Sequence, residues 1–228
     1  MRRWLGRLAL ALFGLACLRL CWLLGWVLFW TSHDPGATSF MELRLAELRE
    51  KNPQAQLRQQ WVPYERISTH LKRAVIAAED AKFVDHDGFD WEGIQKAIEK
   101  NEKKGRLAAG GSTISQQLAK NLFLTPSRTF WRKGNEALIT LMLEHLWSKR
   151  RILEVYLNVI EWGDGVFGAE AAARHYYGIG AAQLGPEQAA RLAGMVPSPR
   201  FYDRNRAAPG LAKKSAVILA RMPGAAVP

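Results

Sequence analysis

The sequence of 228 residues contains little cysteine. Cys17 and Cys21 both lie in an apolar stretch near the N-terminus, and the rest of the chain has none. A disulfide framework and a zinc site built on cysteines are therefore excluded. The sequence also lacks an internal repeat and any clear alternation of apolar and polar residues, which is typical of half-buried strands. These absences predict one mostly α-helical globular unit.

Acidic residues are also scarce, with 21 Asp and Glu against 32 Lys and Arg, for a formal net charge of +11. Such an excess of positive charge predicts a polyanionic partner. Nucleic acid, anionic lipid headgroups and a phosphorylated substrate all fit, and the charge does not choose among them.

Residues 8–30 are almost wholly apolar, which is long enough for a helix to cross a bilayer, although Arg19 interrupts them. Three basic residues precede this stretch: Arg2, Arg3 and Arg7. The positive-inside rule then places the N-terminus in the cytoplasm and the rest of the chain outside it, away from nucleic acid. The alternative is a cleaved signal peptide, but no small-x-small cleavage site follows and the stretch exceeds a usual signal core.

We therefore divide the chain into three parts. These are a cytoplasmic tip and transmembrane anchor at 1–30, a stalk or linker at 31–60, and a globular domain at 61–228. Helical periodicity predicts a helix at 41–51 in the stalk and then helices through most of the domain. The domain helices are expected to include 71–78, 91–98 and 114–122, and to cover about 129–148, 149–159, 166–177, 186–194 and 208–221.

Glu79 and Asp80 close the first of these domain helices. A carboxylate at the end of a buried helix can be desolvated, which raises its pKa towards the range of a general base. The alternative is an ordinary solvated helix end. His86 follows in the next loop and is expected to be a hydrogen-bonding strut that holds the loop, rather than a base or a metal ligand.

The segment 110–121 reads GGSTISQQLAKN. Ser112 can cap the helix that follows the two glycines, and free N–H groups at the start of a helix favour an anionic oxygen. Gln117, Lys120 and Asn121 add further hydrogen-bond donors. The alternative is an ordinary capped helix, and the segment lacks the Gly-Lys-Ser/Thr order of a nucleotide phosphate loop.

A third cluster contains Arg128, Arg132, Lys133 and Glu136. Its cations are strong phosphate donors, and Glu136 shares the helix face of Arg132 and Lys133. The alternative is an ordinary surface ion pair.

A fourth segment, KRRILEVYLNVIEWG at 149–163, carries Glu154 and Asn158 one helical turn apart. We expect both side chains to hydrogen-bond neighbouring loops, which is a structural role.

These four segments, in this order, resemble the ordered motifs of the family 51 peptidoglycan glycosyltransferases, beginning with EDAKFVDHDG at 79–88 and including RKGNE at 132–136. The resemblance covers roughly residues 61–200. With one anchor and no second domain, the chain is similar to the monofunctional biosynthetic members of that family. The resemblance implies a lysozyme-like α fold, a location in the inner membrane, and polymerisation of lipid II into β-1,4-linked glycan with release of undecaprenyl pyrophosphate.

The resemblance also implies residue roles. Glu79 would be the base that deprotonates the acceptor sugar, and Glu136 would support the departing diphosphate, through a divalent cation such as Mg²⁺ or Mn²⁺. The implied substrate-binding residues are Asp80, Ser112, Gln117, Lys120, Asn121, Arg128, Arg132 and Lys133. The implied structural residues are His86, Glu154 and Asn158.

The implied partners are lipid II, the nascent glycan chain, the inner membrane and other cell-wall synthesis or division proteins, with no nucleic acid. The segment 89–109 would lie near the membrane. Two alternatives remain open: a hydrolase of the same lysozyme-like class, which needs no phosphate-binding cations, and a membrane-tethered, non-enzymatic binder of anionic polymer.

Overall fold

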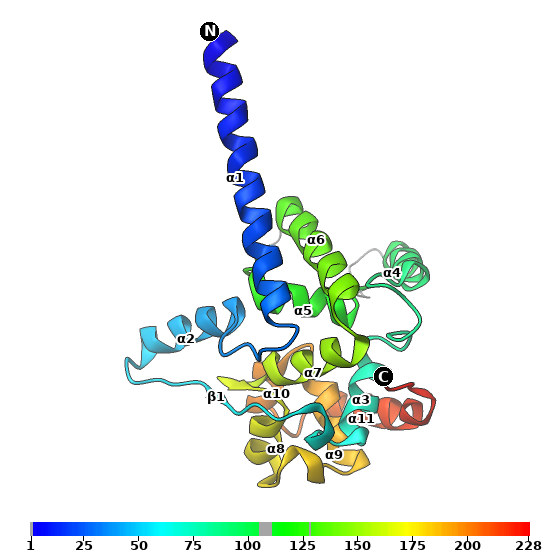
Figure 1. The fold of residues 1–228 in the computed structure, drawn as a ribbon. Coiled ribbons are helices and arrows are strands. Elements are labelled where there is room, and N and C mark those ends of the chain that lie inside the picture. The colour runs from blue at the N-terminus through cyan, green and yellow to red at the C-terminus, as the bar shows by residue number, and fades with distance from the viewer. Residues whose placement is uncertain (1, 105–110, 128) are drawn as a thin grey trace. The chain divides into compact units, whose positions relative to one another are not determined.

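A computed structural model gives the fold of the chain and describes residues 2–104, 111–127 and 129–228 (Figure 1). Two residues of the sequence-based site, Gly110 and Arg128, lie outside the described residues. The structure divides into two compact units, Met1–Asp34 and Pro35–Pro228. The domain boundaries that we place at residues 30 and 60 stay predictions.

The N-terminal unit contains the single helix α1 (Arg2–Phe29). Its stretch Trp4–Phe29 is long and apolar enough to cross a membrane. Large apolar side chains such as Leu8, Phe13 and Leu18 are exposed along it. A helix with this many exposed apolar groups suits lipid better than water, so the expected anchor helix is confirmed as a helix.

The larger unit is built mainly of helices, as predicted. The helix expected at 41–51 begins slightly earlier, because the Thr38 side chain caps it by accepting a hydrogen bond from the Met41 N–H. The α-helices are α2 (Ser39–Lys51), α3 (Thr69–Glu79), α4 (Trp91–Lys104), α5 (Ile114–Phe123), α6 (Phe130–Leu146), α7 (Lys149–Val159), α8 (Ala169–Tyr177), α9 (Pro186–Met195), α10 (Pro199–Arg204) and α11 (Pro209–Arg221). Short 3₁₀ turns are η1 (Tyr64–Arg66), η2 (Ala181–Gln183) and η3 (Met222–Gly224).

The described residues also form a small sheet that the sequence does not predict. Its strands are β1 (Arg58–Gln59), β2 (Glu161–Gly163) and β3 (Val166–Phe167), in the order β1-β3-β2. β1 runs parallel to β3, and β2 runs antiparallel to it. Strands this short show no alternation in the sequence, which is why they escape detection.

Gly168 separates β3 from α8, so the helix predicted at 166–177 begins only at Ala169. Gly168 has a φ of +81°, and a Cβ at this position would lie 2.7 Å from the carbonyl oxygen of Asn158. Only glycine fits such a conformation and such a close approach. This turn brings the start of α8 against the end of α7.

Helix α7 supplies the centre of the core, since Ile152, Leu153, Tyr156 and Leu157 are all fully buried. Helix α5 packs against α2, α6 and α7, and α3 packs against α9 and α11 (Figure 1). Packing against these neighbouring helices holds both α3 and α5 in place.

Glu154 and Asn158 tie α7 to the segment before α3. The Asn158 side chain accepts a hydrogen bond from the Val62 N–H at 3.0 Å and donates one to the Val62 carbonyl at 2.9 Å. The Glu154 carboxylate accepts a hydrogen bond from the Tyr64 N–H at 2.9 Å. These contacts give both residues the structural role that their spacing suggests.

Candidate active site

Glu79 is the last residue of α3 and points its carboxylate towards α5. The side chain is partly buried and accepts a hydrogen bond from Gln117 Nε2 at 2.8 Å. Burial raises the pKa of Glu79 above its usual range, while the Gln117 hydrogen bond and the positive charges of Lys214 and Lys120 oppose that rise. A desolvated carboxylate with one hydrogen bond has the character of a general base.

Asp80, the residue next to Glu79, is held in place by hydrogen bonds from His86 and from the start of α5. The buried Asp80 carboxylate accepts hydrogen bonds from the Ile114 N–H and from His86 Nε2, both at 3.0 Å. His86 Nδ1 accepts a hydrogen bond from the Gly88 N–H at 3.1 Å, so the imidazole proton lies on Nε2. His86 thus makes the contacts of a strut.

An anionic oxygen of the protein itself lies at the start of α5. The Asp80 carboxylate occupies this place by binding the Ile114 N–H. The Asp80 carboxylate binds the Ile114 N–H and the Thr113 hydroxyl binds the Gln116 N–H, so a ligand anion at this end of α5 stays a prediction. Direct contact between Asp80 and substrate stays a prediction.

Thr113, and not Ser112, caps α5. The Thr113 hydroxyl accepts a hydrogen bond from the Gln116 N–H, and the Gln116 side chain accepts one from the Thr113 N–H. This capping box leaves Ser112 exposed. Ser112 and Glu79 together line a small hollow of about 120 Å³.

Tyr156 sets the orientation of Gln117. The Tyr156 hydroxyl donates a hydrogen bond to Gln117 Oε1 at 2.8 Å, which turns the Gln117 amino group towards Glu79. Complete burial raises the pKa of Tyr156 well above its usual value, so the hydroxyl stays a donor. The sequence identifies Tyr156 only as a core residue.

Glu136 lies in a cluster of cations on the first turns of α6. Its carboxylate is buried and forms ion pairs with Arg132 and Lys133, which lie four and three residues earlier on the helix, respectively. The Thr129 side chain caps this helix by accepting a hydrogen bond from the Arg132 N–H at 3.2 Å. The cap fixes the turn that carries both cations.

Lys120 lies within the electrostatic influence of both carboxylates. Burial lowers the pKa of Lys120, Glu136 and Glu79 both act to raise it, and Arg132 and Lys133 lower it. These electrostatic effects are strong only over short distances. Glu79, Glu136 and the cations predicted from two separate motifs therefore share one electrostatic environment around Lys120.

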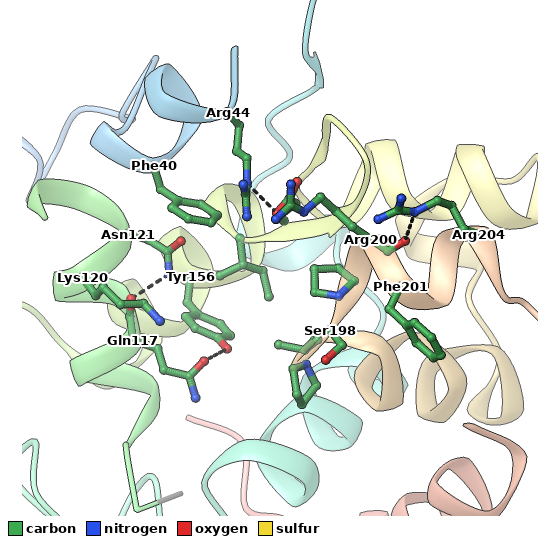
Figure 2. Close-up of a pocket in the computed structure, with 15 residues that line it drawn as sticks. Phe40, Arg44, Gln117, Lys120, Asn121, Tyr156, Ser198, Arg200, Phe201 and Arg204 are labelled. Atoms are coloured by element: carbon green, nitrogen blue, oxygen red, sulfur yellow. Dashed lines mark hydrogen bonds and ion pairs between the residues drawn. The ribbon is translucent and has the colours of Figure 1, made fainter. Parts of the chain in front are cut away.

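A cavity of about 440 Å³ opens beside this cluster (Figure 2). Gln117, Lys120 and Asn121 of α5 form one side, and the residues of α10 form the opposite side. Tyr156 lies between the two sides. The volume is in the range of small-molecule binding sites, and the lining combines charged and amide side chains with aromatic and aliphatic ones.

Lys214 is a site residue that the sequence did not reveal. It lies on α11, and its ammonium group donates a hydrogen bond to the Gly194 carbonyl at 3.0 Å. Burial lowers the pKa of Lys214, and the Glu79 charge opposes this effect. Nothing in the amphipathic pattern of the last helix distinguishes this lysine, because its proximity to Glu79 arises only from tertiary packing.

The described residues contain no group of three or more His, Cys, Asp or Glu side chains that could hold a metal ion. Glu136 offers one carboxylate, which Arg132 and Lys133 already neutralise. Mg²⁺ is commonly held by one or two carboxylates together with substrate phosphates, so Glu136 fits as a single ligand of a cation that arrives with a diphosphate.

Comparison with known proteins gives consistent matches over nearly the whole chain. A family model described as transglycosylase matches residues 45–223. The chain is 75% identical over 226 residues to a biosynthetic peptidoglycan transglycosylase of Dechloromonas aromatica, covering 99% of this chain and 98% of the relative. It is 64% identical to a protein of the same name from Azoarcus sp., covering 99% and 97% of the two chains, and 58% identical to one from Laribacter hongkongensis over the full length of both. The chain belongs to the transglycosylase family.

Proposed function

We propose that this protein is a membrane-anchored peptidoglycan glycosyltransferase that polymerises lipid II into β-1,4-linked glycan strands and releases undecaprenyl pyrophosphate. One observation carries the proposal. Glu79, with a raised pKa, and Glu136, with its two cations, both act on Lys120 in one polar cluster beside a cavity. A base and a set of phosphate-binding cations are the two parts that transfer from a sugar diphosphate requires.

Glu79 acts on the acceptor sugar. Its carboxylate takes the proton of the 4-hydroxyl as the hydroxyl oxygen bonds to the anomeric carbon of the donor. Gln117 holds the carboxylate by a hydrogen bond and leaves its other oxygen available for the proton. Because attack comes from the face opposite the diphosphate, the α-linked donor gives a β linkage.

Lys120, Arg132 and Lys133 act on the departing diphosphate. As the bond from the anomeric carbon to the diphosphate oxygen breaks, its electron pair passes to that oxygen. Fixed cations stabilise the growing negative charge. Arg128 is the fourth cation that we propose for this group, and Asn121 and Ser112 are proposed to bind sugar groups near the same place.

We also propose that Mg²⁺ or Mn²⁺ accompanies the diphosphate, with Glu136 as its protein ligand. The cation would neutralise phosphate charge in addition to the lysine and arginine side chains. Binding of the ion would require Arg132 and Lys133 to move from Glu136 to the phosphate oxygens, since both now contact the carboxylate.

We propose an inner-membrane location, with the N-terminus in the cytoplasm and the larger unit in the periplasm, where the nascent glycan and other cell-wall proteins are its partners. Helix α1 supports the anchor. Within the larger unit, Phe130 and Trp131 are 98% and 77% exposed and Trp91 is 72% exposed. Exposed aromatic side chains next to lysines suit the interface of a membrane that holds a polyprenyl tail.

Purified full-length protein in detergent, given labelled lipid II and Mg²⁺ or Mn²⁺, tests the proposal. We expect a polymer that lysozyme degrades, and we expect Glu79→Gln to abolish it. Glu187→Gln, which changes an exposed glutamate on α9, is the matched control and should retain activity. Digestion of isolated cell-wall polymer without use of lipid II would instead identify a hydrolase, and binding without any product would identify a polymer-binding protein.

A further inference from the structure

The cavity has a second polar wall that the proposed reaction does not use. It includes the α10 side of the cavity, opposite Lys120, and consists of Arg44 from α2, Glu161 from β2, and Arg200 and Arg204 from α10 (Figure 2). We call these four residues the arginine wall. Arg44 and Glu161 are 117 residues apart in sequence, so only the fold brings them together.

Positive charge on this wall is only partly neutralised. Arg44 Nε donates to Glu161 Oε2 at 3.1 Å, and Arg44 also pairs with Glu47. Arg200 reaches the same Glu47 carboxylate at 3.4 Å. Glu47 therefore serves two guanidinium groups at once, and it does not line the cavity.

Arg204 has no carboxylate partner among the residues that the structure describes. Its one hydrogen bond runs from Nε to the Arg200 carbonyl at 3.1 Å, which leaves the two terminal nitrogens of the guanidinium group available. Arg200 and Arg204 lie four residues apart on the same short helix. Like charges at this spacing repel each other, and an anion between them would remove that repulsion.

Glu161 adds an acceptor to the same wall. Its side chain is buried, and Oε1 has no hydrogen-bond partner among the described residues. A buried acceptor without a donor costs free energy, which a donor on a bound ligand would recover. A ligand that fits the wall therefore carries an anionic group for the guanidinium groups and an N–H or O–H group for Glu161.

A peptide with free carboxylates meets both requirements, because its amides donate hydrogen bonds and its carboxylates match the planar fork of arginine. We propose that the arginine wall binds the peptide attached to the glycan substrate, through its carboxylates, and so selects the charge state of that peptide. This inference rests on the proposed function, since it takes the glycan in the cavity to be one that bears peptides.

Direct binding gives the first test. The full-length protein in detergent is titrated by calorimetry with a soluble disaccharide-peptide whose carboxylates are free, and with the same molecule after amidation. We expect the Arg200→Gln/Arg204→Gln variant to bind the free form at least five times more weakly and the amidated form unchanged. The control is Arg66→Gln/Arg73→Gln, which removes two exposed arginines outside the cavity. If the double variant does not fold, Arg204→Gln alone is used, because the Arg204 guanidinium has no ion pair to lose.

Polymerisation gives the second test, with lipid II that carries free or amidated peptide carboxylates. We expect the double variant to raise KM for the free form several-fold and to leave kcat unchanged. An equal loss for both forms would overturn the proposal and assign the wall to the glycan, and no loss for either form would also overturn it. Absence of polymer from the unaltered protein, with selective binding intact, would reject the proposed function and leave only the recognition of peptide carboxylates by the arginine wall.

Discussion

Glu79 and Glu136 are both carboxylates in the interior of the larger unit, and their surroundings differ in kind. Glu79 has an amide as its hydrogen-bond partner, and the charges of Lys120 and Lys214 lower its pKa without an ion pair to either, but burial dominates and raises the pKa. Glu136 is held by two cations in direct contact. The first arrangement keeps a carboxylate reactive towards protons, and the second uses a carboxylate to hold cations in place.

The difference separates a proton-transfer role from an electrostatic role within one polar cluster. A carboxylate that must accept a proton needs few neighbouring positive charges, because these would lower its pKa. A carboxylate that organises phosphate-binding cations can hold them by ion pairs until the phosphate oxygens replace it, as we propose for Arg132 and Lys133. Lys120 lies in the field of both carboxylates and is the residue through which the two roles interact.

Neutralising each glutamate in turn tests most directly whether Glu79 and Glu136 have different roles. We expect Glu79→Gln to lower kcat by roughly 10² to 10⁴-fold, the usual contribution of a general base. Its thermal stability should stay equal or rise, because a buried charge is removed. Glu136→Gln should lower kcat/KM less but reduce the free energy of unfolding by roughly 3 kcal/mol, because Arg132 loses its buried partner. Thermal denaturation and steady-state kinetics on both variants measure the contrast, and equal stability losses would contradict it.

Lys120→Met tests whether the two clusters interact. Removal of one fixed donor to a developing oxyanion costs about 10²-fold in kcat, and we expect a loss of this size. The positive charge of Lys120 lowers the pKa of Glu79, so its removal should also move the acid limb of the pH profile to higher pH. The control is Lys213→Met, which changes an exposed lysine on α11. An unmoved acid limb would show that Lys120 acts on the leaving group alone.

The pH dependence of the unaltered protein tests whether Glu79 is a base with a raised pKa. The base must be ionised, so activity should be full above the pKa of Glu79 and fall about tenfold per pH unit below it. Because burial raises this pKa, the fall should begin at higher pH than for an ordinary glutamate. The same shift means that the folded state binds the proton more tightly, so Glu79 contributes a free energy of unfolding that increases as pH falls through its pKa. A kcat profile that stays flat down to the ordinary glutamate range would reject the assignment.

The smallest expected effect belongs to Tyr156→Phe. Loss of the hydroxyl leaves Gln117 Oε1 without its donor and allows the amide to turn, so the hydrogen bond to Glu79 is held less well. We expect a several-fold loss of kcat and a further rise in the pKa of Glu79, because Gln117 lowers it. The shift is read from the pH profile of kcat, and a change in KM alone would contradict the proposed role of Tyr156.

Local patterns in the sequence predicted the helices well, because the period of apolar residues and the capping side chains act within a few residues. The anchor helix and the helices that carry Glu79, Lys120 and Glu136 lie where expected. The sheet was missed, since the pairing of Arg58 with Val166 depends on residues more than 100 positions apart. The cap of α5 was misplaced by one residue, because Ser112 and Thr113 are chemically alike and only the capping box with Gln116 distinguishes them.

The site was predicted in part, through its motifs. Proximity of residues within one motif follows from helix geometry, as for Arg132 and Glu136. Proximity between distant elements does not, and for that reason Lys214, Tyr156 and the Arg44–Glu161 pair gave no signal. The role of Asp80 at the start of α5 was hidden for the same reason.

The geometry of helix α5 also fixes the spacing between Gln117 and Lys120. Gln117, which holds the proposed base, and Lys120, which we propose acts on the leaving group, lie on the same helix. Asp80, the residue next to Glu79, binds the Ile114 N–H at the start of that helix. Three residues of helix rise give an axial offset of about 4.5 Å between the two side-chain origins. In the proposed reaction, this offset helps to set the distance between the attacking oxygen and the departing phosphate, so we expect a donor with one more atom between sugar and phosphate to fit the site poorly.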